Sequence, residues 1–150
     1  MKETLKLKGH YDIEIREHGK LVKTISLDNV LTELYRQAIM DSLMQGDSIE
    51  MKYFAVGTDD TPATASDTTL GAEVFRSVPT YQEKTTAGLV TTWVLTAEQA
   101  NYYLKEIGVF IGSTATATAD TGILMSRINI DIQKTSAVEI TFRRTDYIII

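Results

Sequence analysis

Two adjacent stretches alternate apolar with polar side chains: GILMSRINIDI at residues 122–132 and AVEITFRRT at residues 137–145. A period of two places successive side chains on opposite faces of an extended chain, which is typical of half-buried β-strands. The residues expected to face a common core are Leu124, Ile128, Ile130 and Ile132 in the first stretch, and Val138, Ile140 and Phe142 in the second. Both stretches are therefore predicted to be strands.

The same period occurs earlier in the chain. Tyr11, Ile13 and Ile15 alternate with charged residues, and His18-Gly19-Lys20 supplies a tight turn, so residues 5–27 are predicted to form a hairpin. The 21 threonines favour strands, because β-branched side chains suit a pleated surface. Further strands are expected at 51–58, 72–84, 89–96 and 103–111, with Pro79 placing the second of these at an edge or bulge. The total is about seven to eight strands.

One segment has a different period. From Val30 to Leu43, apolar residues recur at three- and four-residue steps, which predicts an amphipathic helix over about residues 29–45. Asp28 or Asn29 is the expected N-cap, and Gly46 the expected stop. Because turns separate most strands, we expect a mainly β fold: an antiparallel β-sandwich with this helix packed against it, all in a single domain, 1–150.

Composition limits the chemistry that the chain can perform. The 150 residues carry a formal net charge of -5 and no cysteine, which excludes disulfides, thiolate metal sites and cysteine nucleophiles. The acidic balance argues against a nucleic-acid partner, whose phosphates require clustered Lys and Arg. No run of about 18 apolar residues predicts a membrane span.

Catalytic and metal-binding motifs are not evident. His10 and His18 flank the first hairpin and are expected to lie on its surface. Asp59, Asp60 and Asp67 form an acidic loop that could offer oxygen ligands to Ca²⁺, but their spacing lacks the EF-hand pattern. Asp67 is expected instead to cap the turn at Thr68-Thr69-Leu70. We therefore expect neither an enzyme nor a cofactor.

Four charged residues stand inside otherwise apolar strands: Glu73, Arg76, Glu106 and Arg127. Burying an unpaired charge costs several kcal/mol, so each must face solvent, pair with an opposite charge inside the protein, or lie in a subunit interface. All three alternatives remain open, and the four residues are interface or structural candidates.

Four large apolar residues end the sequence: Tyr147, Ile148, Ile149 and Ile150. An uncovered apolar strand promotes aggregation, so this segment is expected to dock. It could complete the sheet of its own domain, or a neighbouring subunit could cover it; a longer natural chain is the third alternative.

Several short pieces follow one another in order between Asn29 and Phe142. After a helix that opens near Asn29 come Ala55-Val56-Gly57-Thr58, a Thr/Pro/Ala loop with Pro62, Ser66-Asp67-Thr68, Leu70, Glu73 and Arg76, then Glu106-Ile107-Gly108-Val109-Phe110, Leu124-Met125-Ser126-Arg127 and Lys134. This ordered set resembles the N-terminal module of tail-fibre and tail or baseplate proteins of tailed bacteriophages and prophages.

The resemblance implies a structural protein of a virion, made in the bacterial cytoplasm and assembled with other tail or baseplate proteins. Such parts surround a symmetry axis, so we expect a homo-oligomer, a trimer or a ring. Two alternatives are a capsid decoration protein and a β-sandwich that binds a host receptor or surface glycan. In the latter, Trp93, Tyr81, Tyr102 and Tyr103 would offer stacking surfaces, although Trp93 lies in an apolar strand and is expected in the core.

Overall fold

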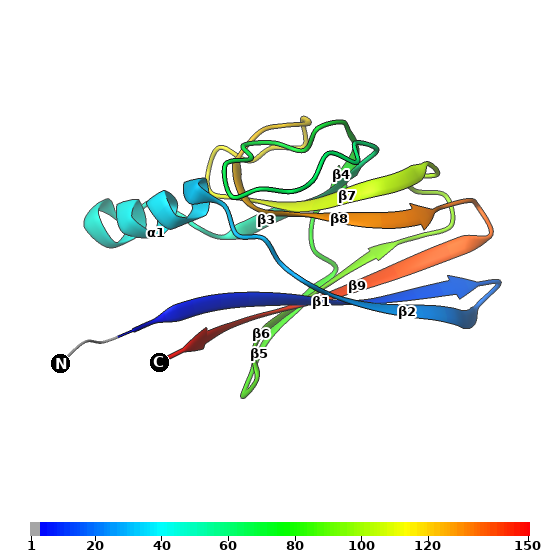
Figure 1. Ribbon diagram of the computed structural model, residues 1–150, viewed down its shortest axis with the longest axis horizontal. Helices are drawn as coiled ribbons and strands as arrows, with labels where there is room; N and C mark the ends of the chain where they lie inside the picture. Colours follow the sequence, from blue (N-terminus) through cyan, green and yellow to red (C-terminus); the bar gives the residue numbers. More distant parts are fainter. Residues whose placement is uncertain (1–3) are drawn as a thin grey trace.

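A computed structural model describes residues 4–150. Over this range the chain forms nine β-strands and one α-helix (Figure 1). The elements are β1 (Lys6–Glu17), β2 (Lys20–Asp28), α1 (Glu33–Gln45), β3 (Met51–Gly57), β4 (Glu73–Ser77), β5 (Tyr81–Thr85), β6 (Gly88–Leu95), β7 (Tyr103–Ile111), β8 (Ile123–Gln133) and β9 (Val138–Ile149).

The strands form two antiparallel sheets that face each other. One sheet has the order β2-β1-β9-β6-β5 and the other has the order β4-β3-β7-β8. Every pair of neighbours is antiparallel, which confirms the predicted mainly β sandwich. Both sheets bring together strands from distant parts of the chain. In the first sheet β9 lies between β1 and β6, and in the second β3 lies beside β7.

The core fills the space between the sheets. Trp93 of β6 is fully buried at its centre, with ring centroids 5.6 Å from Phe54 and 5.5 Å from Phe142. Its indole Nε1 donates a hydrogen bond to Ser77 Oγ at 2.7 Å, so its polar atom is satisfied. Trp93 therefore lies in the core and offers no stacking surface to a glycan.

The predicted hairpin is present as β1 and β2, which pair from His10↔Asp28 to Glu17↔Lys20. Gly19 at the turn has φ 78, a left-handed conformation that glycine adopts without steric cost. The alternation in residues 137–145 also holds, since Ile140 and Phe142 are fully buried.

The prediction that Leu124 shares a face with Ile128, Ile130 and Ile132 is wrong. The β7–β8 register shifts between Val109 and Phe110, where Phe110 pairs with Leu124 and Val109 with Ser126. An extra residue at such a bulge reverses the alternation. Leu124 consequently faces outward from the sandwich, beside Phe110.

The expected single strand at 72–84 is two strands in different sheets. β4 pairs with β3, whereas β5 pairs with β6. Pro79 lies in the connection that crosses from one sheet to the other, where its missing N–H costs no ladder hydrogen bond. Residues 4–150 therefore form nine strands, whereas seven to eight were predicted.

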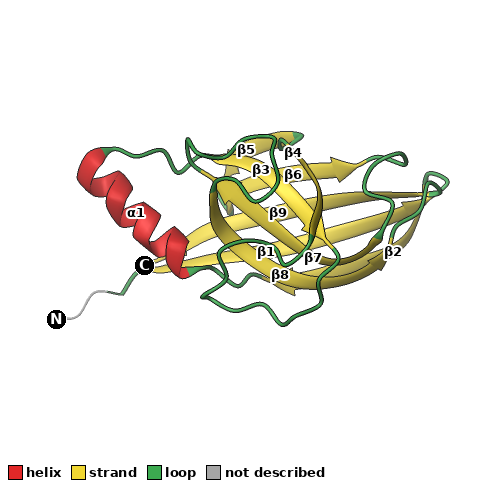
Figure 2. Ribbon diagram, turned by 90° about the horizontal axis from the view of Figure 1, so that it is seen from above, coloured by secondary structure: helices red, strands yellow, loops and turns green. Residues whose placement is uncertain are grey.

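The helix begins later than predicted and is less covered. Thr32, not Asp28 or Asn29, is the N-cap, accepting a hydrogen bond from the N–H of Tyr35, while Gly46 ends the helix in the left-handed conformation, as expected. The preceding segment, from Asn29, crosses to β8, and Leu31 forms a bridge with Ser126. α1 then projects beyond the strands (Figure 2), and Ala38 is its single buried residue. The prediction that the helix packs against the sandwich therefore holds only for its first turns.

Candidate functional site

Two long loops cover the outer face of the β4-β3-β7-β8 sheet (Figure 1); we call residues 58–72 and 112–122 the outer loops. Beneath them is a small second core, made of Ala55, Leu70, Phe110 and Leu124. Gly108 permits this contact, because a Cβ there would lie 2.8 Å from Leu70 Cδ2 and 3.0 Å from the Ser126 carbonyl oxygen. The outer loops are thus packed on the sheet.

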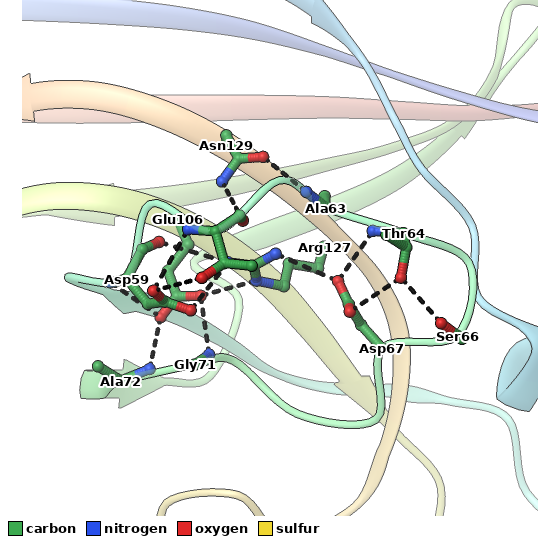
Figure 3. Close-up of polar contacts among 11 residues, drawn as sticks. Asp59, Ala63, Thr64, Ser66, Asp67, Gly71, Ala72, Glu106, Arg127 and Asn129 are labelled. Atoms are coloured by element: carbon green, nitrogen blue, oxygen red, sulfur yellow. Dashed lines mark hydrogen bonds and ion pairs between the residues drawn. The ribbon is translucent and has the colours of Figure 1, made fainter.

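A buried ion pair between β7 and β8 secures the first outer loop (Figure 3). The carboxylate of Glu106, fully buried, accepts a hydrogen bond from Arg127 Nε at 2.7 Å. It also accepts from the N–H groups of Gly71 at 2.9 Å and Ala72 at 2.8 Å. Gly57 leaves room here, since a Cβ would meet the Ala72 carbonyl oxygen at 2.5 Å. Glu106 therefore binds β8 and the loop at once.

Arg127 continues this network toward the tip of the loop. Its Nη1 donates to Asp67 Oδ2 at 3.2 Å, and its Nη2 donates to the Asp59 carbonyl oxygen at 3.3 Å. Burial opposes the charge of Arg127, but its contacts with Glu106 and Asp67 hold its pKa above the ordinary value.

Asp67 has a different role from the one predicted. It accepts hydrogen bonds from the N–H and the hydroxyl of Thr64, which precedes it, rather than capping the turn that follows. Burial raises the pKa of Asp67, but the bonds from Thr64 and Arg127 outweigh it and lower the pKa below the usual value. Asn129 adds two further bonds, from Ala63 N–H and to the Thr61 carbonyl oxygen. The loop is therefore held along most of its length.

The second outer loop is held by Glu73 and Arg76 of β4. Their side chains are almost fully buried and form two parallel bonds, Nε to Oε2 at 2.6 Å and Nη2 to Oε1 at 2.7 Å. Arg76 Nη1 donates to the carbonyl oxygens of Thr116 and Thr121, each at 3.0 Å. The guanidinium also lies 4.3 Å from the ring centroid of Phe110. Among the three alternatives for the four strand charges, the structure shows internal Glu–Arg pairs.

Two further buried cations, Arg144 and Lys134, were not among the strand charges predicted to need a partner. Arg144 is fully buried and binds Asp146 through two bonds of 2.8 Å, and its Nη1 donates to Tyr11 Oη at 3.2 Å and also to Ser126 Oγ. It thereby joins β1 and β9 to β8 across the sandwich. The alternation that buries Ile140 and Phe142 also points Arg144 inward, so the pattern contained this information.

Lys134 is the second buried cation. Its Nζ donates to Asn101 Oδ1 at 2.9 Å and to the Ala97 carbonyl oxygen at 3.3 Å. Burial lowers its pKa, and Glu98 and Glu139 oppose that shift. Lys134 thus holds the connection between β6 and β7 in place.

The C-terminal segment, unlike these buried charges, is largely exposed. β9 pairs with β1 as far as Lys6↔Ile149, but its contact with β6 ends at Leu89↔Asp146. Ile148 and Ile149 are about half exposed, and Ile150 is fully exposed. The segment therefore completes the chain's own sheet, one of the expected alternatives, and still leaves apolar side chains uncovered.

This segment borders an apolar opening that we call the α1 cleft. Two adjoining cavities of about 290 Å³ and 180 Å³ share Leu7, Leu31 and Tyr35. One wall is formed by the projecting ends of β1 and β9, and the other by the start of α1. The residues that line it include Leu5, Leu7 and Ile148 from the strands, and Leu31, Tyr35 and Ile39 from the helical side.

The remaining candidates lie outside both regions. His10 is partly exposed and contacts Asp28 and Asp12 at 2.9 Å and 3.3 Å, and the bond with Asp28 chiefly raises its pKa. His18 lies in the hairpin turn. Among residues 4–150, no group of three or more His, Cys, Asp or Glu side chains is placed to hold a metal ion.

In the part of the chain that the structure describes, no helix is long and apolar enough to cross a membrane.

Comparisons with other proteins place no further residue in a site. The sequence matches no protein-family model, and neither a curated protein nor a solved structure is significantly similar to it.

Proposed function

We propose that this protein is a structural component of a tailed-phage virion or a phage-tail-like particle, in the tail fibre or baseplate, and that it acts through protein–protein contacts. The proposal begins from the ordered motifs that resemble tail-fibre and baseplate proteins. It needs no catalytic group, because the residues that carry the resemblance hold the outer loops on the sheet.

One observation carries the proposal: several of the motif residues, dispersed in the sequence between Asp67 and Arg127, lie together beneath the outer loops. Asp67, Glu106 and Arg127 form one network, and Glu73 and Arg76 form the next. Leu70 fills the space above Gly108. Residues that depend on one another in this way constitute a structural unit, so their joint occurrence is harder to attribute to chance than that of any single motif.

The unit has the properties that a particle component needs. Long loops that are tied down by buried pairs present a fixed surface, and a fixed surface loses little conformational entropy when a partner binds. The exposed apolar residues around the α1 cleft add a region that favours association.

Purified particles test the proposal. Tailed particles from the strain that carries this gene should contain the protein by mass spectrometry, and immunogold labelling should place it on the tail. Its gene should also lie beside genes for tail or baseplate proteins. Particles with intact tails that lack the protein would overturn the proposal.

A further inference from the structure

The carboxyl end of β2 contacts β1 through a histidine. His10 of β1 pairs with Asp28, the last residue of β2, and this is the final pair of the β1–β2 ladder. The imidazole Nδ1 lies 2.9 Å from Asp28 Oδ1, and Nε2 lies 3.3 Å from Asp12 Oδ1. Ser26 of β2 donates to the same Asp12 oxygen at 2.8 Å. One imidazole therefore contacts carboxylates on both strands.

This arrangement specifies the protonation state of the ring. A neutral imidazole has one N–H donor and one acceptor nitrogen, whereas an ionised carboxylate can only accept. Both ring nitrogens of His10 face carboxylate oxygens, so only the imidazolium can donate to both. Loss of one proton leaves a nitrogen lone pair opposite a carboxylate oxygen, and one of the two hydrogen bonds is lost. The geometry of the contacts therefore distinguishes the two protonation states of His10.

Other side chains share this outer face of the sheet with His10. Hydrogen bonding to Asp28 is the largest influence on the pKa of His10 and raises it; burial lowers the pKa, and the charge of Asp12 raises it further. Thr145, which lies opposite His10 on β9, is uncharged. The alternation of the strands places three more titratable side chains at adjacent positions: Lys8 on β1, and Arg143 and Tyr147 on β9. None of these three is an anion at neutral pH, so the two aspartates are the groups that favour the imidazolium.

The His10–Asp28 contact lies where the chain leaves the first sheet (Figure 1). Immediately after Asp28, residues 29–32 cross to β8 and lead into α1; we call them the crossing segment. The N–H of Asn29 donates to the carbonyl oxygen of Gly9, the neighbour of His10 in the sequence, at 2.9 Å. The start of the crossing segment is therefore held by the residues that adjoin the His10–Asp28 contact.

We propose that His10 is a proton-dependent clasp, whose imidazolium form fastens the end of β2 and the start of the crossing segment to β1. With both protons, His10 makes charge-assisted bonds to the two strands; after loss of one proton, the end of β2 opens more often. Folding raises the pKa of His10 above its ordinary value near 6.5. The stabilisation is therefore complete below about pH 6.5 and is lost as the pH rises through the folded pKa. The inference goes beyond the virion role and does not depend on it.

Titration of the ring nitrogens by NMR tests the clasp directly, because the chain has only two histidines. His10 should keep protons on both ring nitrogens to a higher pH in wild type than in Asp28→Asn. Asp12→Asn should lower the pKa of His10 less, since the contact with Asp28 is the shorter one. Asp47→Asn, at an exposed position after α1, is the matched control and should leave the titration unchanged. Identical titration of His10 in wild type and Asp28→Asn would overturn the inference.

Amide hydrogen exchange measures the opening of the crossing segment. After correction for the intrinsic exchange rate, the opening constant at the Asn29 N–H should rise about 3-fold from about pH 6 to about pH 8.5, as expected for a partly exposed ion pair. The rise should be absent in His10→Asn. It should persist in His18→Asn, the matched control in the hairpin turn, where asparagine tolerates the left-handed conformation of His18. An opening constant that is independent of pH in wild type, or that rises equally in His10→Asn, would show that His10 does not fasten β2.

Discussion

At the outer face of the β4-β3-β7-β8 sheet, buried charges have partners within the same chain, whereas around α1 large apolar side chains remain exposed. Arg127 meets Glu106 and Asp67, and Arg76 meets Glu73. In the other region, Leu43, Met44 and Ile150 are mostly or fully exposed. The outer face therefore contributes to the stability of one chain, while the end that carries α1 has free energy to gain from contact with another surface.

The difference also distinguishes unusual residues that stabilise the fold from unusual residues that favour association. Charged residues within strands and apolar residues at a terminus both depart from the usual pattern, and both were candidates for an interface. The charges are satisfied internally, so substituting them should alter folding. The apolar residues are not covered, so substituting them should alter association.

The largest effect should come from Glu106→Gln. Removing the charge leaves buried Arg127 without its closest carboxylate and weakens the acceptor for Gly71 and Ala72, at a cost of about 4 kcal/mol in the free energy of unfolding. Urea titration followed by Trp93 fluorescence measures this cost. Glu33→Gln is the control, because the Glu33–Arg36 pair is exposed and should contribute less than about 0.5 kcal/mol. A loss as small as that of the control would show that the Glu106–Arg127 pair does not hold the loop.

Glu73→Gln should follow, at about 3 kcal/mol, because Arg76 keeps the carbonyl oxygens of Thr116 and Thr121 when its carboxylate is lost. The effect should be local as well as global. Limited proteolysis should cut within residues 112–122 faster than in wild type, while residues 58–72 stay protected by Glu106. Unchanged cleavage together with a loss below about 0.5 kcal/mol would contradict the assigned role.

Much of the fold could be predicted because its information is local. The period of two in 137–145 and the turn at Gly19 depend on neighbouring residues only, and both were correct. The errors arose where geometry between strands intervenes. The bulge that turns Leu124 outward is a property of the β7–β8 pair, and the crossover at Pro79 is visible only when two sheets are present.

The candidate site was predictable in part for the same reason. The cost of burying charge singled out Glu106 and Arg127, but their pairing depends on register across residues 21 apart in sequence. The burial of Arg144 could have been predicted, since its position in the alternation matches that of Phe142. The α1 cleft could not have been predicted, because the exposure of Leu43 follows from where the second sheet ends. No local sequence pattern encodes that limit.

Asp67→Asn should have a smaller effect that depends on pH. Folding lowers the pKa of Asp67. Its ionised form therefore stabilises the protein at pH values above the unfolded pKa, which is near 3.9. This contribution is lost as the pH falls through the folded pKa. Wild type should exceed Asp67→Asn by about 1 kcal/mol at neutral pH, and the difference should shrink below about pH 4. Asp60→Asn, at an exposed position of the same loop, is the control and should change the free energy of unfolding by less than about 0.5 kcal/mol at neutral pH. A constant difference between pH 7 and pH 3 would contradict the link between Asp67 and Arg127.

The smallest effect on folding should come from the region with the most exposed apolar surface. Leu43→Ser combined with Met44→Ser should change the free energy of unfolding of the isolated chain by less than about 0.5 kcal/mol, because neither side chain is covered. Leu70→Ser, in the first outer loop, should lower the free energy of unfolding by about 3 kcal/mol, since Leu70 is buried against Phe110 and Leu124. Trp93 fluorescence at low protein concentration measures both without a contribution from association. Were the two substitutions equally destabilising, Leu43 would be part of the monomer's core, and the contrast between an internally satisfied face and an unsatisfied end would not hold.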